Sequence, residues 1–207
     1  LRTGPCRPVR VGWLGLLAAS GGLLHLLMDF GNNYGVHPFW PVYDGWFHAD
    51  AIFIIEPWLI IVLTGMAGGV SRSRGLRAAL LLGLAALLAL VWGVAQASVW
   101  LALALTVVAV PWVLGLWRAS FRVRWRLGGG ALVACGLLLL GTRHIARANA
   151  REVLDREALD REGGATLRLV DLISTPAPSN PLCWSLLTVQ RSERAYVVRQ
   201  AVASGWP

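Results

Sequence analysis

Long apolar runs separated by short polar segments dominate the first two thirds of the chain. Residues 11–30 and 51–70 each approach the roughly 20 residues that a helix needs to cross a hydrocarbon core of about 30 Å. Residues 78–117 contain no charged side chain over 40 positions. This stretch is twice the length of one crossing, so we predict a helical hairpin that turns within residues 93–98. A shorter Gly-rich run, residues 127–142, is the fifth predicted span.

Composition supports this interpretation. The chain is 56% hydrophobic and only 14% charged, whereas a soluble domain has about a quarter of its residues charged. All 19 basic residues are arginine, and they occur in short clusters between the apolar runs instead of one basic patch. This distribution argues against nucleic-acid binding and indicates a multi-pass membrane protein whose main partner is the lipid bilayer.

The arginine clusters also predict the topology. Loop residues 31–50 contain no arginine. If each span crosses once, ten arginines fall on the opposite side: Arg2, Arg7, Arg10, Arg72, Arg74, Arg77, Arg118, Arg122, Arg124 and Arg126. Positively charged loops remain in the cytoplasm, so we expect a cytoplasmic N-terminus. The loop and everything after Thr142 would then be extracytoplasmic.

The last third of the chain has a different pattern. Residues 143–162 alternate in charge sign, with Arg147 and Glu152 near helical neighbour spacing, which predicts a solvated helix. Short apolar runs separated by prolines and a polar turn then predict a β-meander, with Trp184 in its small core. These runs are residues 167–173, 183–189 and 195–202.

The predicted fold class is therefore an all-α multi-pass membrane protein with about five transmembrane helices and a small C-terminal helix plus β-meander domain. We assign residues 1–142 to the transmembrane domain, with a site loop at residues 31–50. Residues 143–207 form the predicted extracytoplasmic domain.

Ionisable residues gather at the outer ends of the first two predicted spans. His25 and Asp29 are four residues apart, so both point to the same side of one helix. An imidazole nitrogen and a carboxylate oxygen at this spacing can bind one divalent metal, and Zn²⁺ or Mn²⁺ suits such a mixed site. The alternative is a histidine bonded to a neighbouring helix and a helix-end acid in the headgroups.

The sequence resembles the bacterial inner-membrane proteins known as LexA-regulated, membrane-bound metal-dependent hydrolases. The resemblance is carried by the motifs HLLMDF, NNYGVHPFWP, DAIFIIEPW and TPAPSNPLCW at residues 25–30, 32–41, 50–58 and 175–184. It covers the first helix, the loop, the second helix and the outer domain. Another family motif, of the type HRGxTHS, has no counterpart here, and the chain starts at Leu1. Either the chain lacks its N-terminal part, or half of the site that the resemblance implies is absent.

The resemblance implies a metal site at the outer membrane interface. His25 and Asp29 correspond to the metal-ligand pair, and Asp50 and Glu56 to acidic positions that would serve as ligand or general base. Near them, four loop residues would contact the substrate: Asn32, Asn33, Tyr34 and His48.

The expected function is thus hydrolysis of a lipid-linked ester or phosphoester by a divalent-metal enzyme in the inner membrane. Two alternatives remain at this point. The same buried histidines and acids could relay protons in a transporter, although residues 78–117 offer no ionisable path. A non-enzymatic scaffold that binds a partner through the β-meander is the other alternative.

Overall fold

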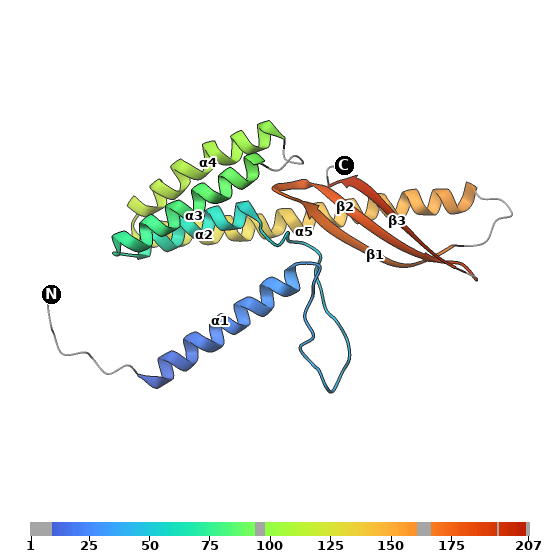
Figure 1. Cartoon of the computed structure of the whole chain (residues 1–207), viewed down its shortest axis with the longest axis horizontal. Helices are drawn as coiled ribbons and strands as arrows, with labels where there is room; N and C mark the ends of the chain where they lie inside the picture. Colours follow the sequence, from blue (N-terminus) through green and yellow to red (C-terminus); the bar gives the residue numbers. More distant parts are fainter. Residues whose placement is uncertain (1–9, 94–97, 161–166, 194, 206–207) are drawn as a thin grey trace.

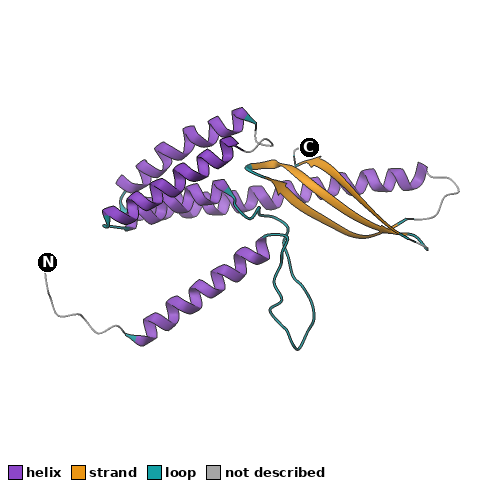
Figure 2. Ribbon diagram, viewed as in Figure 1, coloured by secondary structure: helices purple, strands orange, loops and turns teal. Residues whose placement is uncertain are grey.

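The structure is a computed structural model that describes residues 10–93, 98–160, 167–193 and 195–205. It contains a bundle of helices that continues into a helix-backed sheet (Figures 1 and 2). The helices are α1 (Val11–Gly31), α2 (Pro57–Val70), α3 (Arg74–Gly93), α4 (Val99–Arg118) and α5 (Phe121–Asp160). The strands are β1 (Arg168–Ala177), β2 (Asn180–Arg191) and β3 (Tyr196–Ser204).

Within the described residues, four helices are long and apolar enough to cross a membrane: α1, α3, α4 and the part of α5 from Phe121 to Arg156. Helices α3 and α4 form the predicted hairpin on either side of residues 94–97, which lie outside the described segments. The fifth apolar helix, α2, has 14 residues and is therefore about 21 Å long. It is shorter than the predicted span over residues 51–70.

The late start of α2 has a local cause. Pro57 occupies the first helical turn and Glu56 is the N-cap residue, with extended backbone. Proline disfavours helical backbone in the residue before it and fits the first turn itself. Residues 51–56 therefore follow an irregular path before the helix, and the predicted span at residues 51–70 began too early.

Small residues let α2 pack closely in the bundle. A Cβ atom added at Gly68 would lie 2.1 Å from the Trp117 ring of α4, and one at Gly128 of α5 would lie 2.5 Å from Met66. The Trp117 indole also donates a hydrogen bond to the Thr64 carbonyl, at 3.2 Å. Such close backbone approach is how helices associate in a membrane, where lipid removes the hydrophobic driving force between them.

Helix α5 is continuous over 40 residues, about 60 Å. The predicted span at residues 127–142 and the predicted solvated helix at residues 143–162 are thus parts of one helix, as far as residue 160. The proposed domain boundary between residues 142 and 143 falls inside this helix, and that division remains a prediction.

A three-stranded antiparallel sheet in the order β1-β2-β3 packs on the second half of α5. The predicted β-meander is therefore confirmed, and the term all-α is inexact because the sheet is a substantial part of the fold. Trp184 is completely buried and packs with Ala146, Leu172 and Leu186, as predicted. Pro176 was expected between strands but lies in β1, an edge strand, next to a register shift, where a missing N–H is tolerated.

The turns that carry arginine gather at one end of the bundle. Figure 1 shows the start of α1, the α2–α3 turn and the start of α5 at the left end, and the sheet at the opposite end. Arg124 is buried there and its guanidinium donates to the carbonyls of Leu116 and Ala119 at 2.9 and 2.7 Å. Which end faces the cytoplasm remains a prediction.

Candidate functional site at the junction of loop, helix and sheet

The loop between α1 and α2 returns to the end of α1 before α2 begins. The Ala49 N–H donates to the Phe30 carbonyl at 2.6 Å, and the Ala51 and Ile52 N–H groups donate to the Gly31 carbonyl at 2.8 and 2.9 Å. Gly31 allows this contact, since a Cβ atom there would lie 2.8 Å from Cδ1 of Ile52. The return places the segment around Asp50 beside the last turn of α1.

Asp50 is the centre of the site. Its side chain is fully buried, and both of its carboxylate oxygens have partners. Nδ1 of His48 lies 2.8 Å from Oδ1, and the Arg147 guanidinium of α5 donates to Oδ2 at 3.3 Å. Arg147 also donates to the Ser174 hydroxyl of β1 at 3.4 Å. A buried carboxylate requires such partners, so Asp50 joins the loop to α5 and to the sheet.

The backbone at Asp50 is unusual as well. Its φ is +48°, in the left-handed region that side-chain-bearing residues adopt at a cost of about 1–3 kcal/mol. The bonds to His48 and Arg147 offset this cost. Strained backbone held by several interactions is a common feature of functional sites.

The sheet closes over the loop through two further hydrogen bonds. The Asn33 side-chain amide donates to the Thr175 hydroxyl at 3.3 Å, and the Trp58 indole donates to the Ser179 carbonyl at 3.0 Å. Residues 175–184 form one of the motifs that carry the resemblance to the hydrolases. They therefore contact the motifs at residues 32–41 and 50–58.

The predicted substrate-contacting residues differ in exposure. The buried Asn32 side chain accepts a hydrogen bond from the Tyr34 N–H at 2.8 Å and forms a turn, whereas Tyr34 itself is exposed. His48 is 37% exposed. His48 and Tyr34 are therefore accessible, while Asn32 shapes the backbone.

Glu56 is the second buried acid near this junction. It precedes α2, outside the helical segments, and its Oε1 has no hydrogen-bond partner among the described residues. Burial raises its pKa from 4.5 to about 7, against the opposing effect of backbone hydrogen bonds from Trp58 and Phe53. A carboxyl group with this pKa changes protonation near neutral pH.

The His25–Asp29 pair has different surroundings. Nε2 of His25 lies 3.3 Å from Oδ2 of Asp29, and the side chains are 78% and 40% exposed. Both residues share one face of α1. The apolar stretch of this helix that is long enough to cross a membrane has no residue buried against the rest of the described chain. They therefore face outward near the helix end that the loop contacts.

A divalent metal site requires three or four protein ligands. Within the described segments no group of three or more histidine, cysteine, aspartate or glutamate side chains could hold an ion. His25 and Asp29 have a suitable nitrogen and oxygen, but they would supply only two of the three or four ligands that such a site requires.

The remaining histidines are explained by their contacts. His37 stacks on Trp46 with ring centroids 5.0 Å apart and lies 3.0 Å from Asp44, so it packs within the loop. His144 is exposed on α5.

Sequence analysis missed Arg147 as a site residue. It was paired with Glu152, but Glu152 contacts Arg156 instead, and Arg147 points to Asp50. The available signal was the small-residue face of α5: Ala146 and Ala150 mark the side on which the sheet packs, and Arg147 borders that face.

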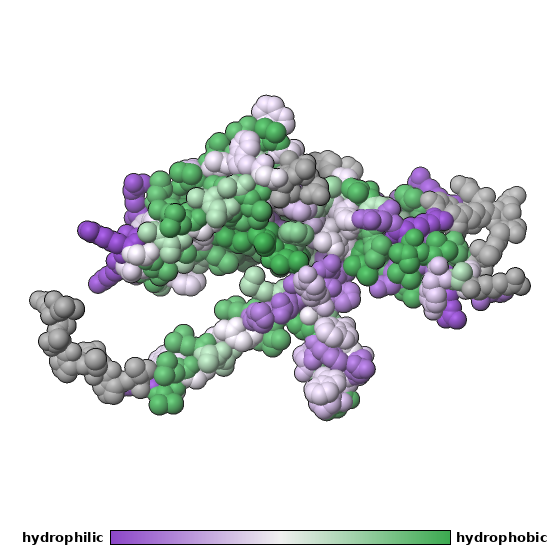
Figure 3. Space-filling view, in the orientation of Figure 1, coloured by the Kyte–Doolittle hydropathy of each residue, from purple (hydrophilic) through white to green (hydrophobic). Residues whose placement is uncertain are grey.

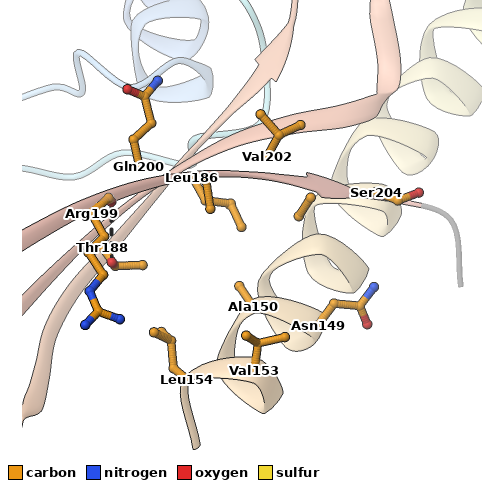
Figure 4. A pocket seen from close by; sticks show the side chains of 12 residues that line it. Asn149, Ala150, Val153, Leu154, Leu186, Thr188, Arg199, Gln200, Val202 and Ser204 are labelled. Atoms are coloured by element: carbon orange, nitrogen blue, oxygen red, sulfur yellow. Dashed lines mark hydrogen bonds between the residues drawn. The ribbon is translucent and has the colours of Figure 1, made fainter. Parts of the chain in front are cut away.

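A groove of about 430 Å³ opens between α5 and the sheet (Figure 4). It is lined mostly by apolar residues, among them Val153 and Leu154 of α5 and Leu186 of β2, with Arg199 at one side. Its lining contains no acid or histidine and shares no residue with the cluster around Asp50. The groove is therefore distinct from the candidate site.

The helices and the sheet define a multi-pass membrane protein with a helix-backed β-meander. Residues 3–99 match the family described as YdjM inner membrane protein, a range that covers α1, the loop, α2 and α3. This match is consistent with the resemblance seen in the sequence, and with the four long apolar helices it supports a membrane location. No curated protein and no solved structure gives a significant match.

Proposed function

We propose that this protein is a membrane-bound, metal-dependent hydrolase whose site lies at the outer interface of the inner membrane. Its substrate would be an ester or phosphoester on a lipid-linked molecule. The observation that supports this best is the His48–Asp50–Arg147 arrangement, in which a buried carboxylate holds an accessible imidazole.

In this proposal Asp50 is a positioning residue, because both of its oxygens are already bound. When Asp50 is ionised it accepts the hydrogen of Nδ1, so Nε2 of His48 is unprotonated in the neutral imidazole and can take up a proton. Arg147 holds the carboxylate and compensates its charge. This division of roles is the one that carboxylate–histidine pairs have in hydrolytic sites.

His25 and Asp29 would hold the divalent ion, Zn²⁺ or Mn²⁺, which when bound supplies an activated water for hydrolysis. Asp29 directly precedes Phe30, whose carbonyl accepts the Ala49 N–H. The pair is thus connected to the Asp50 segment through adjacent backbone. Glu56, with a pKa near neutral, would serve as a second proton carrier.

The site also suits an amphiphilic substrate. It is situated where α1 ends and the loop begins, so a lipid-linked ester could reach it from the membrane. A transporter is a poorer explanation, because residues 78–117, which make up most of the α3–α4 hairpin, carry no charged side chain.

Hydrolysis of a chromogenic phosphodiester and a chromogenic carboxylic ester by the detergent-purified full chain tests the proposal. We expect activity with added Mn²⁺ or Zn²⁺, its loss with a chelator, and at least about a hundredfold decrease in His48→Gln, the lower end of what a general base contributes. His144→Gln is the matched control and should retain activity. Equal, metal-independent activity in both variants would contradict the proposal.

A further inference from the structure

The aromatic loop, residues 36–47, is a folded arm that projects from the junction of α1 and α2. Val36 and Phe47 exchange two backbone hydrogen bonds, of 2.8 and 2.9 Å, at its base. Near its tip the Phe39 carbonyl accepts the N–H groups of Val42 and Tyr43, at 2.9 and 3.0 Å. These bonds give the arm a defined shape.

Ring contacts hold the arm together from within. His37 stacks on Trp46, and Phe47 meets Phe39 edge to face with centroids 5.7 Å apart. Gly35 permits the turn into the arm, since its φ is +74° and a Cβ atom would lie 2.9 Å from the Phe47 carbonyl oxygen. The arm thus has internal contacts, but they leave the outer faces of its large side chains uncovered.

The exposed surface of the arm is aromatic and apolar. Val42 at the tip is 94% exposed. The other exposed large side chains are Phe39, Trp40, Tyr43, Trp46 and Phe47. A contiguous set of this kind marks an interaction surface instead of a water-facing one. In Figure 3 the arm is pale lilac with purple parts, because Trp and Tyr lie near the middle of the hydropathy scale and the arm also contains His37 and Asp44.

The direction of the arm indicates what covers it. Figure 1 shows the arm extending across the direction of α5, from the end of α1 that is nearer the sheet. Because α1 and α5 are candidate membrane spans, a segment that leaves the end of α1 across the helices runs along the membrane plane, at the level of the headgroups.

The chemistry of the arm matches that level. Trp and Tyr concentrate at membrane–water interfaces, where their rings combine an apolar body with a polar group. Residues 31–50 contain no arginine or lysine, and Asp44, the acid within residues 36–47, lies 3.0 Å from His37. The arm is therefore suited to bind lipid through its aromatic side chains and not through attraction to anionic headgroups.

We propose that the aromatic loop is an interfacial anchor that rests on the outer leaflet, with Val42 and the neighbouring rings at the boundary of headgroups and acyl chains. The occupant of this surface is the bilayer that α1 crosses. Because Phe47 is followed directly by His48, the anchor also holds the candidate site at headgroup depth. The inference does not depend on the hydrolase proposal.

A depth measurement in vesicles tests the anchor. The three native cysteines are replaced by serine in the full chain, and an environment-sensitive fluorophore is attached to Val42→Cys. The protein is reconstituted in phosphatidylcholine vesicles that carry a nitroxide quencher either near the headgroup or near the end of the acyl chain. Val198→Cys on the sheet and Leu17→Cys on α1 are the matched controls, because both residues are exposed.

We expect the probe at Val42 to be quenched most by the nitroxide near the headgroup, and about tenfold less accessible to aqueous iodide than the probe at Val198, since an interfacial segment is buried in the acyl boundary. The probe at Leu17 should respond most to the deeper nitroxide. Replacement of part of the lipid by phosphatidylglycerol should leave the result at Val42 unchanged.

Three outcomes would overturn the inference. Iodide access at Val42 equal to that at Val198 would mean that the arm stands in water. Protection from iodide without quenching by either lipid nitroxide would mean that protein, such as a second copy of the chain, covers the arm. Dependence on phosphatidylglycerol would contradict the aromatic mode of binding.

Discussion

Two of the three histidine–aspartate pairs among the described residues have the same chemistry but opposite surroundings. His25 and Asp29 lie on one exposed face of α1, 3.3 Å apart, with no other ion-pair partner among the described residues. His48 and Asp50 lie 2.8 Å apart in the loop, and Asp50 is buried and bound by Arg147. The first pair is formed by one helix alone, whereas the second requires the loop, α5 and the sheet.

This difference separates two properties that a candidate site needs. The pair on α1 is accessible and can accept a further ligand, but few contacts hold it in place. The pair in the loop is held rigidly through Arg147 and Ser174, but only His48 remains accessible. A hydrolytic site that combined them would take its ligands from the exposed pair and its positioned proton carrier from the buried one.

The largest expected effect concerns the contact between the sheet and α5, on which we expect the His48–Asp50 pair to depend. Trp184→Ala removes a fully buried ring from the contact between sheet and α5 and should lower the free energy of unfolding by about 3–5 kcal/mol. Thermal unfolding of the detergent-purified chain measures it. Trp40→Ala, in the exposed aromatic loop, is the control and should have little effect in detergent. Equal effects would mean that the sheet does not support the junction.

The second prediction concerns pH and Glu56. Because the pKa of Glu56 in the folded chain is raised to about 7, the fold favours the protonated acid. This contribution is fully present below about pH 4.5 and is lost as pH rises through about 7, by about 3 kcal/mol at most for a shift of this size. Unfolding midpoints at several pH values measure the loss.

The matched variant for that prediction is Glu56→Gln, which cannot ionise. Its unfolding midpoint should change less with pH than that of the unaltered chain. Glu152→Gln, at an exposed position of α5, should retain the full pH dependence. An unchanged pH dependence in Glu56→Gln would assign the effect to another group.

The third prediction compares the two pairs directly. Asp50→Asn keeps the size of the side chain but removes the charge that His48 and Arg147 bind, so we expect a loss of about 2 kcal/mol in the free energy of unfolding. Asp50→Glu keeps a negative charge at this position, but it should retain only part of the free energy of unfolding that Asp50→Asn loses, because the buried space is small. If Asp50→Asn lowered the free energy of unfolding by less than a substitution at an exposed position does, the buried contacts of Asp50 would not stabilise the fold.

The smallest effect is expected at the exposed pair. Asp29→Asn should change the free energy of unfolding by about 0.5 kcal/mol or less, since water screens a helical pair at this exposure. Metal content should respond instead: under the proposed function, Asp29→Asn and His25→Ala lower the bound Zn²⁺ or Mn²⁺ relative to the unaltered chain. Equal metal content in all three proteins would refute the ligand role.

Local features of the sequence predicted much of the fold. The helical hairpin follows from the length of the charge-free stretch. The span predicted at residues 51–70 began too early, although a local feature, Pro57, accounts for the start of α2. The three strands were also predicted in order. The continuity of α5 was not predicted, because its Gly-rich first half and its charged second half have different compositions. Only the packing against α2 and the sheet shows that the two halves form one helix.

The sequence by itself determined that the chain is built around apolar spans, that His25 and Asp29 share a helix face, and that Trp184 belongs to a small core. These properties depend on helical period, strand alternation and hydrophobic length, which act over a few residues. Only the tertiary structure decided that Arg147 binds Asp50 across 97 residues of sequence, that Asn33 reaches Thr175, and that Asp50 is buried while Asp29 is exposed. Such contacts depend on how distant segments pack, and no local period in the chain records that arrangement.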